Sequence, residues 1–363
     1  MHSSTSSSSI VVPPAPYAVS WGLTALILAG LLAGSEVLWR GRGFAPSVRD
    51  SEMLWCVHRQ RVYSEEGRRK IVVLGASRAQ DDIVPEALAQ AFPEYAGVVH
   101  LAVEGHGALP LIKALLQDPD FDGLVIADVT TGLLDSSYDK ANPVGRYEEQ
   151  CLGSLGFWST FNGQFNAWTE AELQSRIALL SPALTLKNLI DQRLSPTPPY
   201  WQTEASRYRP AWFRSGQPPE KLADLRRWRI GMSLSDDTPL DPPDQVIRRI
   251  SEELGPLFQS FTERGGQVVL VRLPSTAEHW ERDERLEPKA LYWDRVESAV
   301  HVPTIHFRDY PELLSFDCPD TSHLDAEDAP EFTRRLAAVV RQRLGLYSTM
   351  SSPGAAVDRT SPR

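Results

Sequence analysis

Residues 70–78 read KIVVLGASR: four apolar residues lie between a lysine and a glycine, and a small residue, a serine and an arginine follow. A short uninterrupted apolar run that stops at glycine is typical of a strand buried on both faces. A serine directly after such a strand lies in a strand-to-helix turn, at the carboxyl end where open α/β sheets place their ligands. We therefore predict a parallel sheet that exposes Ser77 at its edge.

The alternation of strand and helix continues along the chain. Further strands are predicted from short apolar runs at 97–102, 123–128, 266–273 and 302–307. Helices are predicted from apolar spacing at 50–62, 84–92, 108–117, 244–264 and 325–344, the last capped by Asp325 or a neighbour. This alternation predicts an α/β fold with a doubly wound parallel sheet, a flavodoxin-like three-layer sandwich.

The alternation fails between about 140 and 240, where proline and aromatic residues such as Trp168, Trp201 and Trp228 accumulate. We interpret this stretch as an insertion within a domain that spans 40–345. It could form a lid over the site or a subdomain beside the sheet. Its aromatic residues could pack internally or form a contact surface for a membrane or a partner protein. The Ser- and Pro-rich residues 1–16 and residues 346–363 are expected to be disordered tails.

Residues 17–39 form an apolar run whose one charge is Glu36. At about 1.5 Å per residue such a helix spans a hydrocarbon core of roughly 30 Å. Trp21 and Trp39 stand near its ends, where aromatic rings favour the membrane interface. We predict an uncleaved transmembrane anchor, and a signal peptide cleaved after residues 33–35 is the alternative.

The side of the membrane is left open by the sequence. Arg40, Arg42 and Arg49 follow the apolar run and nothing basic precedes it, so the positive-inside rule alone places the domain in the cytoplasm. Cys56, Cys151 and Cys318 could form one disulfide and a free thiol, or remain three thiols. Cysteine content therefore does not decide the compartment.

The charge balance argues against nucleic acid as a partner. The chain carries 47 acidic and 37 basic residues, a net charge of −10, so phosphate backbones would repel it. His279, His301 and His306 lack the spacing of metal ligands, so we propose no metal site and no cofactor.

A second polar motif stands before the last predicted helix, where residues 320–325 read DTSHLD. A serine nucleophile needs a base within hydrogen-bond reach, and the base needs a carboxylate to fix its tautomer. Asp320 and His323 can supply both from one loop. This hypothesis requires Ser77 to meet His323 in near-contact, and a separation above about 8 Å would exclude it.

Together these motifs resemble the SGNH, or GDSL-like, hydrolase superfamily. Gly75-Ala76-Ser77 is similar to the block that carries the nucleophile, although the family's usual Asp before the serine is Ala76 here. Asp320 and His323 are similar to the terminal Asp-x-x-His motif, including the leucine that follows it. The resemblance covers about 70–135 and 265–344, and it implies Ser77 as nucleophile, His323 as base and Asp320 as its partner.

The resemblance also implies an oxyanion hole. Residues 100–105 resemble the second family block, whose glycine N–H lines the hole, so Gly105 and the N–H of Ser77 are the expected donors. The third block normally supplies an Asn, whereas this chain has none among residues 128–132, and Thr130 or Thr131 could donate a hydroxyl instead. Losing one such donor costs roughly 3 to 4 kcal/mol of transition-state stabilisation.

Within the superfamily the chain looks most like membrane-anchored members that work beside membrane-bound O-acyltransferases. The resemblance implies acyl transfer, often O-acetylation, onto an extracytoplasmic polysaccharide or cell-wall polymer, with the large domain in the periplasm. Hydrolysis and transfer are not separated by the sequence, because they differ in how the acceptor site excludes water. The alternatives are a catalytically weak scaffold that binds glycan or docks on a membrane acyltransferase, and a lipid esterase that faces the cytoplasm.

Three further polar side chains are expected at the same edge of the sheet. Arg78 follows the nucleophile and could bind an anionic glycan or cap the sheet edge. His106 could point into the cleft or be solvated. Arg272 ends a core strand and could shape a substrate groove.

Overall fold

The computed structural model describes residues 17–138, 142, 144–152, 157–192, 196–215, 219–234 and 238–346. The tails expected at 1–16 and 346–363 lie outside the described residues, apart from Leu346. The strands are β1 Ile71–Leu74, β2 Val98–His100, β3 Leu124–Asp128, β4 Gln267–Arg272 and β5 Thr304–His306.

Helices precede, separate and follow these strands. Outside the insertion they are α1 Tyr17–Gly41, α2 Glu52–Arg59, α3 Ser77–Asp82, α4 Pro85–Ala91, α5 Leu109–Gln117, α6 Thr131–Leu134, α11 Pro243–Glu263, α12 Ala277–Leu286, α13 Trp293–Val300, η3 Phe307–Asp309, α14 Pro311–Leu314 and α15 Ala329–Arg343. Within the insertion they are α7 Val144–Leu152, α8 Phe157–Gln174, η1 Ala178–Leu180, η2 Pro182–Leu184, α9 Leu186–Asp191 and α10 Pro219–Leu234.

The strands form one five-stranded sheet in the order β2-β1-β3-β4-β5, and every neighbouring pair is parallel. The predicted α/β fold with a parallel sheet is therefore confirmed. The order changes direction at β1, because β2 pairs with one side of β1 and β3 with the other. Ligands of open parallel sheets bind outside the carboxyl ends of the strands at such a point.

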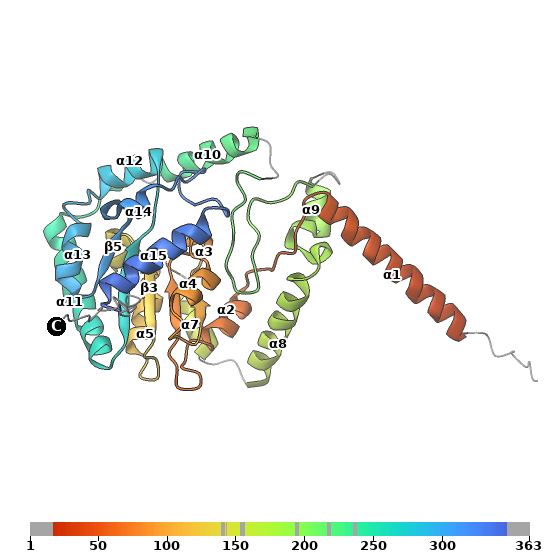
Figure 1. Ribbon diagram of the computed structural model, residues 1–363, viewed down its shortest axis with the longest axis horizontal. Helices are drawn as coiled ribbons and strands as arrows, with labels where there is room; N and C mark the ends of the chain where they lie inside the picture. Colours follow the sequence, from red (N-terminus) through yellow and green to blue (C-terminus); the bar gives the residue numbers. More distant parts are fainter. Residues whose placement is uncertain are drawn as a thin grey trace, which may run out of the picture.

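Helices cover both faces of the sheet (Figure 1). Successive strand residues point to opposite faces, so the side chains of β1 divide between two hydrophobic clusters. Val72 belongs to the cluster that contains Phe258 of α11, and Val73 to the cluster that contains Phe332 of α15. Burial on both faces explains why the strands are continuous apolar runs.

The insertion does not add to the sheet. Its longest helix, α8, packs on α2, and a disulfide between Cys56 and Cys151 joins α2 to α7. The extended segment 199–214 lies against α3, since Arg209 N donates to Gln80 O at 3.0 Å and Trp201 Nε1 to Asp81 Oδ2 at 2.8 Å. Part of the insertion is thus a subdomain beside the sheet, and part reaches α3, the helix that begins at Ser77.

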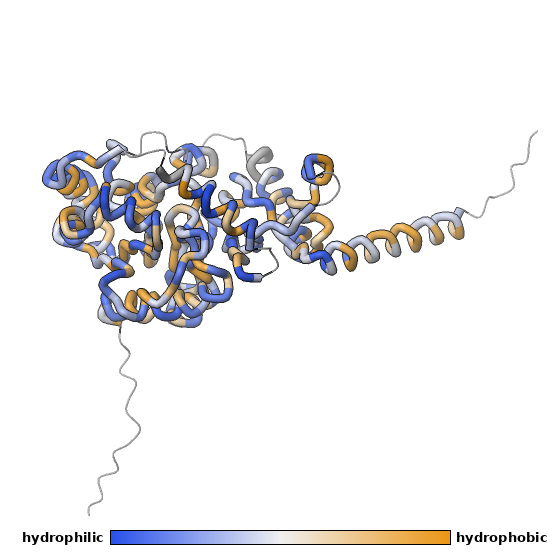
Figure 2. The backbone as a smooth tube through the Cα atoms, turned by 90° about the horizontal axis from the view of Figure 1, so that it is seen from above, coloured by the Kyte–Doolittle hydropathy of each residue, from blue (hydrophilic) through white to orange (hydrophobic). Residues whose placement is uncertain are grey.

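The N-terminal helix α1 is exposed along its length and projects away from the domain (Figure 1). Figure 2 shows that apolar and neutral residues make up nearly all of it. Its 25 residues are long and apolar enough to cross a membrane. This agrees with the helix predicted at 17–39.

The last helix begins later than expected. Asp328, and not Asp325, occupies the N-cap position of α15, and its side chain makes no capping bond. The Asp325 carboxylate instead accepts hydrogen bonds from the N–H groups of Phe213 and Arg214, both at 2.9 Å. It therefore fixes the insertion segment to the loop that carries His323.

Candidate active site

The turn that carries Ser77 is shaped by Gly75. The φ of Gly75 is +150°, and a Cβ there would lie 2.5 Å from Ala79 Cβ and 3.0 Å from Asp128 Cβ. A side chain would therefore separate α3 from β3. Because glycine allows this close approach, Ser77 follows β1 directly as the first residue of α3.

Ser77, His323 and Asp320 form a continuous hydrogen-bonded relay. Ser77 Oγ lies 2.8 Å from His323 Nε2, and His323 Nδ1 lies 2.9 Å from Asp320 Oδ2. The Asp320 carboxylate accepts a hydrogen bond from the Nδ1–H group, so Nε2 is the nitrogen that can accept the Ser77 proton. The near-contact that the sequence hypothesis requires is thus present.

The loop before α15 fixes the carboxylate and the imidazole together. Asp320 Oδ1 accepts the N–H groups of Ser322 at 3.0 Å and His323 at 2.8 Å. Thr321, which lies between Asp320 and Ser322 in the chain, has a φ of +76°. A β-branched residue is strained in this region, and such strain is concentrated at functional sites.

Asp320 is fully buried and has a cationic neighbour from the insertion. Arg229 Nε of α10 lies 2.7 Å from Asp320 Oδ2. Burial raises the pKa of Asp320, but His323 and Arg229 lower this pKa more, so it stays below its ordinary range. The carboxylate is therefore charged at neutral pH and can stabilise a protonated His323.

A second carboxylate approaches the imidazole from α3. Asp81 Oδ2 lies 3.8 Å from His323 Nε2 and accepts the indole N–H of Trp201. Arg209 Nε donates to Asp81 Oδ1 at 2.7 Å, and Arg209 also pairs with Glu104. The Trp201 ring stands edge-on to His323, with the ring centroids 6.3 Å apart. The insertion thus supports the base through both an aromatic ring and a buried ion pair.

Asp82, the next residue, is buried beneath this cluster. Its Oδ1 accepts the Leu324 N–H at 2.9 Å, and its Oδ2 has no hydrogen-bond partner among the described residues. Burial and then the charge of Asp81 hold the pKa of Asp82 well above its ordinary value. The neutral acid is therefore favoured, and it ties α3 to the residue after His323.

Of the expected oxyanion donors, Gly105 and Thr130 have different surroundings. The loop of Gly105 lies beside the turn that carries Ser77, because Val103 N donates to Gly75 O at 3.0 Å. Gly105 itself has a φ of +73° and is exposed. Thr130 instead caps α6, where its Oγ1 accepts the Leu133 N–H at 3.3 Å, and it lines a small cavity with Arg272.

The predicted substrate-binding residues also differ in exposure. Arg78 is half-buried beside Ser77, and His106 is half-buried in the loop of Gly105. Arg272 is buried, pairs with Asp283 and donates to Ser275 Oγ at 3.2 Å. A role in an open substrate groove does not fit this position of Arg272, because its guanidinium serves internal contacts.

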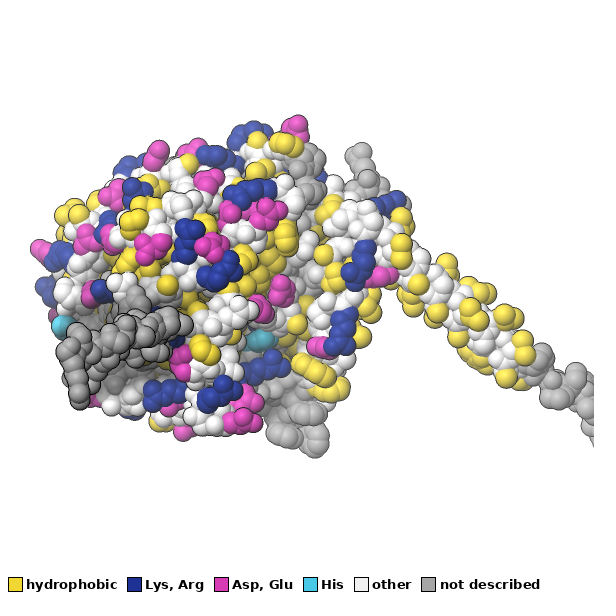
Figure 3. Space-filling view, viewed as in Figure 1, with side chains coloured by type: hydrophobic (Ala, Val, Ile, Leu, Met, Phe, Trp, Pro, Cys, Tyr) yellow, Lys and Arg dark blue, Asp and Glu magenta, His cyan; other side chains and the backbone are white. Residues whose placement is uncertain are grey.

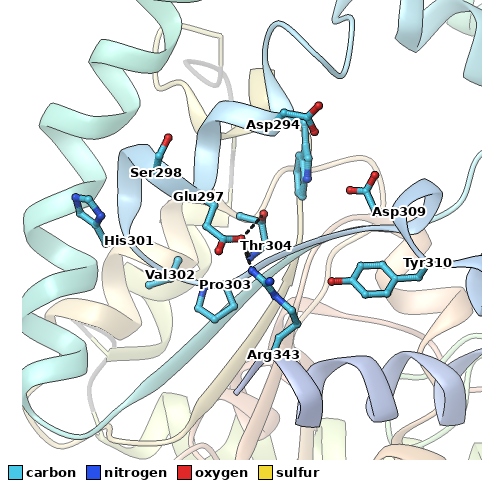
Figure 4. A pocket seen from close by; sticks show the side chains of 11 residues that line it. Asp294, Glu297, Ser298, His301, Val302, Pro303, Thr304, Asp309, Tyr310 and Arg343 are labelled. Carbon is cyan, nitrogen blue, oxygen red and sulfur yellow. Dashed lines mark hydrogen bonds and ion pairs between the residues drawn. The ribbon is translucent and has the colours of Figure 1, made fainter. Parts of the chain in front are cut away.

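Two larger cavities are also lined by the described residues. A groove of about 890 Å³ lies beside the edge strand β5, where Arg343 pairs with Glu297 (Figure 4). None of the three relay residues lines it. A cavity of about 620 Å³ is lined by Trp201, Arg209 and residues of η2 and α9. None of the three relay residues lines this cavity either, but its lining includes Trp201, whose ring faces His323.

The sequence predicts the three relay residues but not the side chains that contact them. Asp81 and Asp82 follow Ser77 closely as an adjacent acidic pair, which is an unusual signal in a short helix behind a buried strand. Trp201, Arg209 and Arg229 lie in an insertion that has no recognisable pattern, so only the fold reveals their place. No family model matches this chain, and no curated protein matches it in sequence.

Proposed function

We propose that this chain is a membrane-anchored serine esterase or O-acyltransferase of the SGNH type. The proposed substrates are acyl groups, most simply acetyl groups, on an extracytoplasmic polysaccharide or cell-wall glycan. The observation that carries the proposal is the relay from Ser77 through His323 to Asp320 at the carboxyl edge of the sheet. The 2-1-3-4-5 strand order supports it as well, because this order is common among doubly wound sheets.

In the proposed reaction, Ser77 Oγ attacks the acyl carbonyl while His323 Nε2 takes its proton. The N–H groups of Ser77 and Gly105 donate to the oxyanion, and Asp320 balances the imidazolium. Collapse of the intermediate breaks the bond to the alcohol, which leaves with the proton from His323. Water or a sugar hydroxyl then attacks the acyl-enzyme, His323 removes the proton of that nucleophile, and Ser77 is regenerated.

The disulfide supports the extracytoplasmic side. Disulfides persist in oxidising compartments and are rare in the cytosol. The bond between Cys56 and Cys151 joins two helices of the domain, so it argues against the orientation that the arginines after α1 favour. A periplasmic reporter at the C-terminus of the full chain should therefore be active, and an inactive reporter would favour the cytoplasmic lipid esterase.

A fluorophosphonate probe tests the enzymatic proposal. It should label the full chain, and Ser77→Ala should abolish the labelling. Ser298→Ala is the matched control, because Ser298 is an exposed serine of α13 outside the relay. A folded wild-type protein that stays unlabelled would contradict the proposal.

A scaffold that binds glycan or docks on a membrane acyltransferase is the second candidate. The position of Thr130 favours it, since this hydroxyl caps α6 and the chain has no Asn at residues 128–132 to complete an oxyanion hole. A scaffold should bind its glycan equally well with Ser77→Ala and should show no acyl-enzyme by mass spectrometry.

A further inference from the structure

The exposed apolar side chains outside α1 are concentrated in one part of the insertion. The described residues include ten large hydrophobic side chains that are exposed outside α1, and six of them lie between 165 and 190. These six are Phe165, Trp168, Leu173, Leu180, Leu186 and Ile190. We call them the apolar flank. Isolated exposed hydrophobics are normal, whereas a cluster of this kind marks a contact surface.

Helix α8 explains why three of these side chains share one side. Its small residues Gly163, Ala167 and Ala171 recur every four positions and face α2 and its neighbours. At about 100° per residue, Phe165 lies opposite these small residues, and Trp168 and Leu173 lie about 60° and 80° to either side of Phe165. Packing of α8 on the domain therefore uses its small residues and directs its large apolar residues outward.

The apolar flank is fixed to the domain end of α1. The Glu36 carboxylate accepts the N–H groups of Ala178 and Leu179, both at 2.9 Å, and Arg40 donates to Arg176 O at 2.8 Å. These contacts explain the one charge in the apolar run. They hold the start of η1 beside the last turns of α1, and η2 and α9 follow directly along the chain.

The position of this attachment along α1 matches the boundary of a membrane. Glu36 lies nineteen residues after Tyr17, which at 1.5 Å per residue is about 28 Å, close to the thickness of a hydrocarbon core. Residues 176–180 would then lie where α1 leaves the bilayer. Figure 3 shows hydrophobic side chains, interspersed with basic and acidic ones, on the flank of the domain nearest α1.

We propose that the apolar flank rests on the surface of the bilayer that α1 spans, with its apolar side chains among the outer acyl chains. The exposed cations Arg176 and Lys187 lie within the same segment, but each is paired with an acidic residue one turn away, so the apolar side chains and not a net charge favour the lipid. A protein partner is less favoured, because the surface continues directly from a helix that is itself apolar and exposed. This inference rests on the proposed membrane anchor and adds a second, lateral contact that holds the domain against the membrane.

The test uses full-length protein in proteoliposomes of phosphatidylcholine and phosphatidylglycerol. A fluorophore is attached to single cysteines at Ile190, Phe165, Leu291 or Leu28, and lipids with a nitroxide near the head of the acyl chain act as quenchers. Interference from native thiols is small, because Cys318 is buried and the other two cysteines form the disulfide. Leu291 is the matched control, since it is an exposed leucine next to α13 and far along the chain from the apolar flank.

We expect the labels at Ile190 and Phe165 to be quenched at least about threefold more than the label at Leu291, because interfacial helices bury their apolar face about 5–10 Å deep. The label at Leu28 should be quenched as well. If the Leu28 label is not quenched, the anchor itself is wrong. If only the Leu28 label is quenched, the anchor stands and the lateral contact is overturned. Shielding of Ile190 from aqueous iodide without lipid quenching would also overturn it, because a protein would then cover the surface.

Discussion

Asp320 holds a negative charge in a fully buried position, and the groups around it show why that charge is tolerated. Two backbone N–H groups donate to one oxygen, while His323 and Arg229 approach the other. A buried carboxylate is stable only when it is paired and hydrogen-bonded in this way. The arrangement also fixes which nitrogen of His323 carries the proton, and so it sets up the base.

Asp320→Asn should therefore impair the base without removing the side chain. An amide in this place can donate to Nδ1 and so favour the wrong tautomer, and we expect labelling of Ser77 by a fluorophosphonate to slow by about 10³- to 10⁴-fold. The measurement is the labelling rate at neutral pH, with circular dichroism to verify folding. Asp317→Asn is the control, because Asp317 is an exposed carboxylate of the same loop. Equal rates for the two variants would remove Asp320 from the relay.

At this scale the sequence predicts the residues whose chemistry depends on a short local motif. Asp320 and His323 are three positions apart in one loop, and Ser77 follows a recognisable strand. Arg272 could not be assigned in the same way, because its partner Asp283 lies on a helix whose packing the sequence does not specify. A guanidinium at the end of a strand is equally compatible with a ligand site and with an internal ion pair.

Among the elements, the short helix α3 carries three groups that meet the loop of His323. Ser77 Oγ contacts Nε2 of the His323 ring, Asp81 Oδ2 lies 3.8 Å from the same nitrogen, and Asp82 accepts the Leu324 N–H. The insertion reaches this helix through Trp201 and Arg209. The position of the nucleophile therefore depends on a segment that lies more than 100 residues away in sequence.

Trp201→Phe tests how strongly the insertion is held. Phenylalanine keeps an aromatic ring beside His323 but removes the N–H that binds the buried Asp81 carboxylate. A hydrogen bond to a charged group is worth about 1.5–3 kcal/mol, so the free energy of unfolding should fall by about that amount. Trp228→Phe, at an exposed tryptophan of α10, is the control and should change it by less than about 0.5 kcal/mol. Similar losses in the two variants would contradict the proposed tie.

The disulfide joins α7 of the insertion to α2 of the domain. Because it closes a loop of 95 residues, replacing Cys56 and Cys151 by serine should lower the free energy of unfolding by about 2–4 kcal/mol. Urea unfolding with and without reductant measures this directly. Reductant should lower the free energy of unfolding of the wild type and leave that of the double variant unchanged. An equal effect on both would mean that the disulfide is not the source of the lost stability.

The elements of the sheet could be predicted because each strand is a buried apolar run bounded by turn residues. The insertion could not, since its longest helix, α8, packs on α2 through glycine and alanine, which give no marked apolar periodicity. Segment 199–214 has no regular structure to predict. Its contacts with α3 become visible only when the chain is folded.

At the scale of the whole molecule, several histidines are buried when the chain folds. His58, His100 and His306 are buried, and burial is the largest cause that lowers their pKa values, to about 3, about 3 and about 2. Positive charges add to the effect, including Arg207 near His58 and His100. The sequence could not reveal this, because burial of a histidine depends on the whole fold.

These histidines should make the stability of the domain depend on pH. Between pH 6.5 and about 3 the unfolded chain binds protons at these positions while the folded chain does not, so protonation favours unfolding as the pH falls. The stability that they contribute is complete above pH 6.5. In the upper part of this window, where most carboxylates are charged in both states, each histidine should remove up to about 1.4 kcal/mol per pH unit.

His100→Gln isolates the contribution of one buried histidine to the pH dependence of the free energy of unfolding. Glutamine can replace the bond from His100 Nε2 to Ala79 O, which is 3.0 Å long, but it does not titrate. The slope of the unfolding free energy between pH 5 and pH 6, measured by urea titration, should therefore decrease by about 1.4 kcal/mol per pH unit. His301→Gln, at an exposed histidine, is the matched control. His100 lies against α3, the helix that begins at Ser77, because its ring binds Ala79 O. An unchanged slope for His100→Gln would therefore mean that α3 opens to solvent in the folded protein. The relay would then be held less rigidly than its hydrogen bonds indicate.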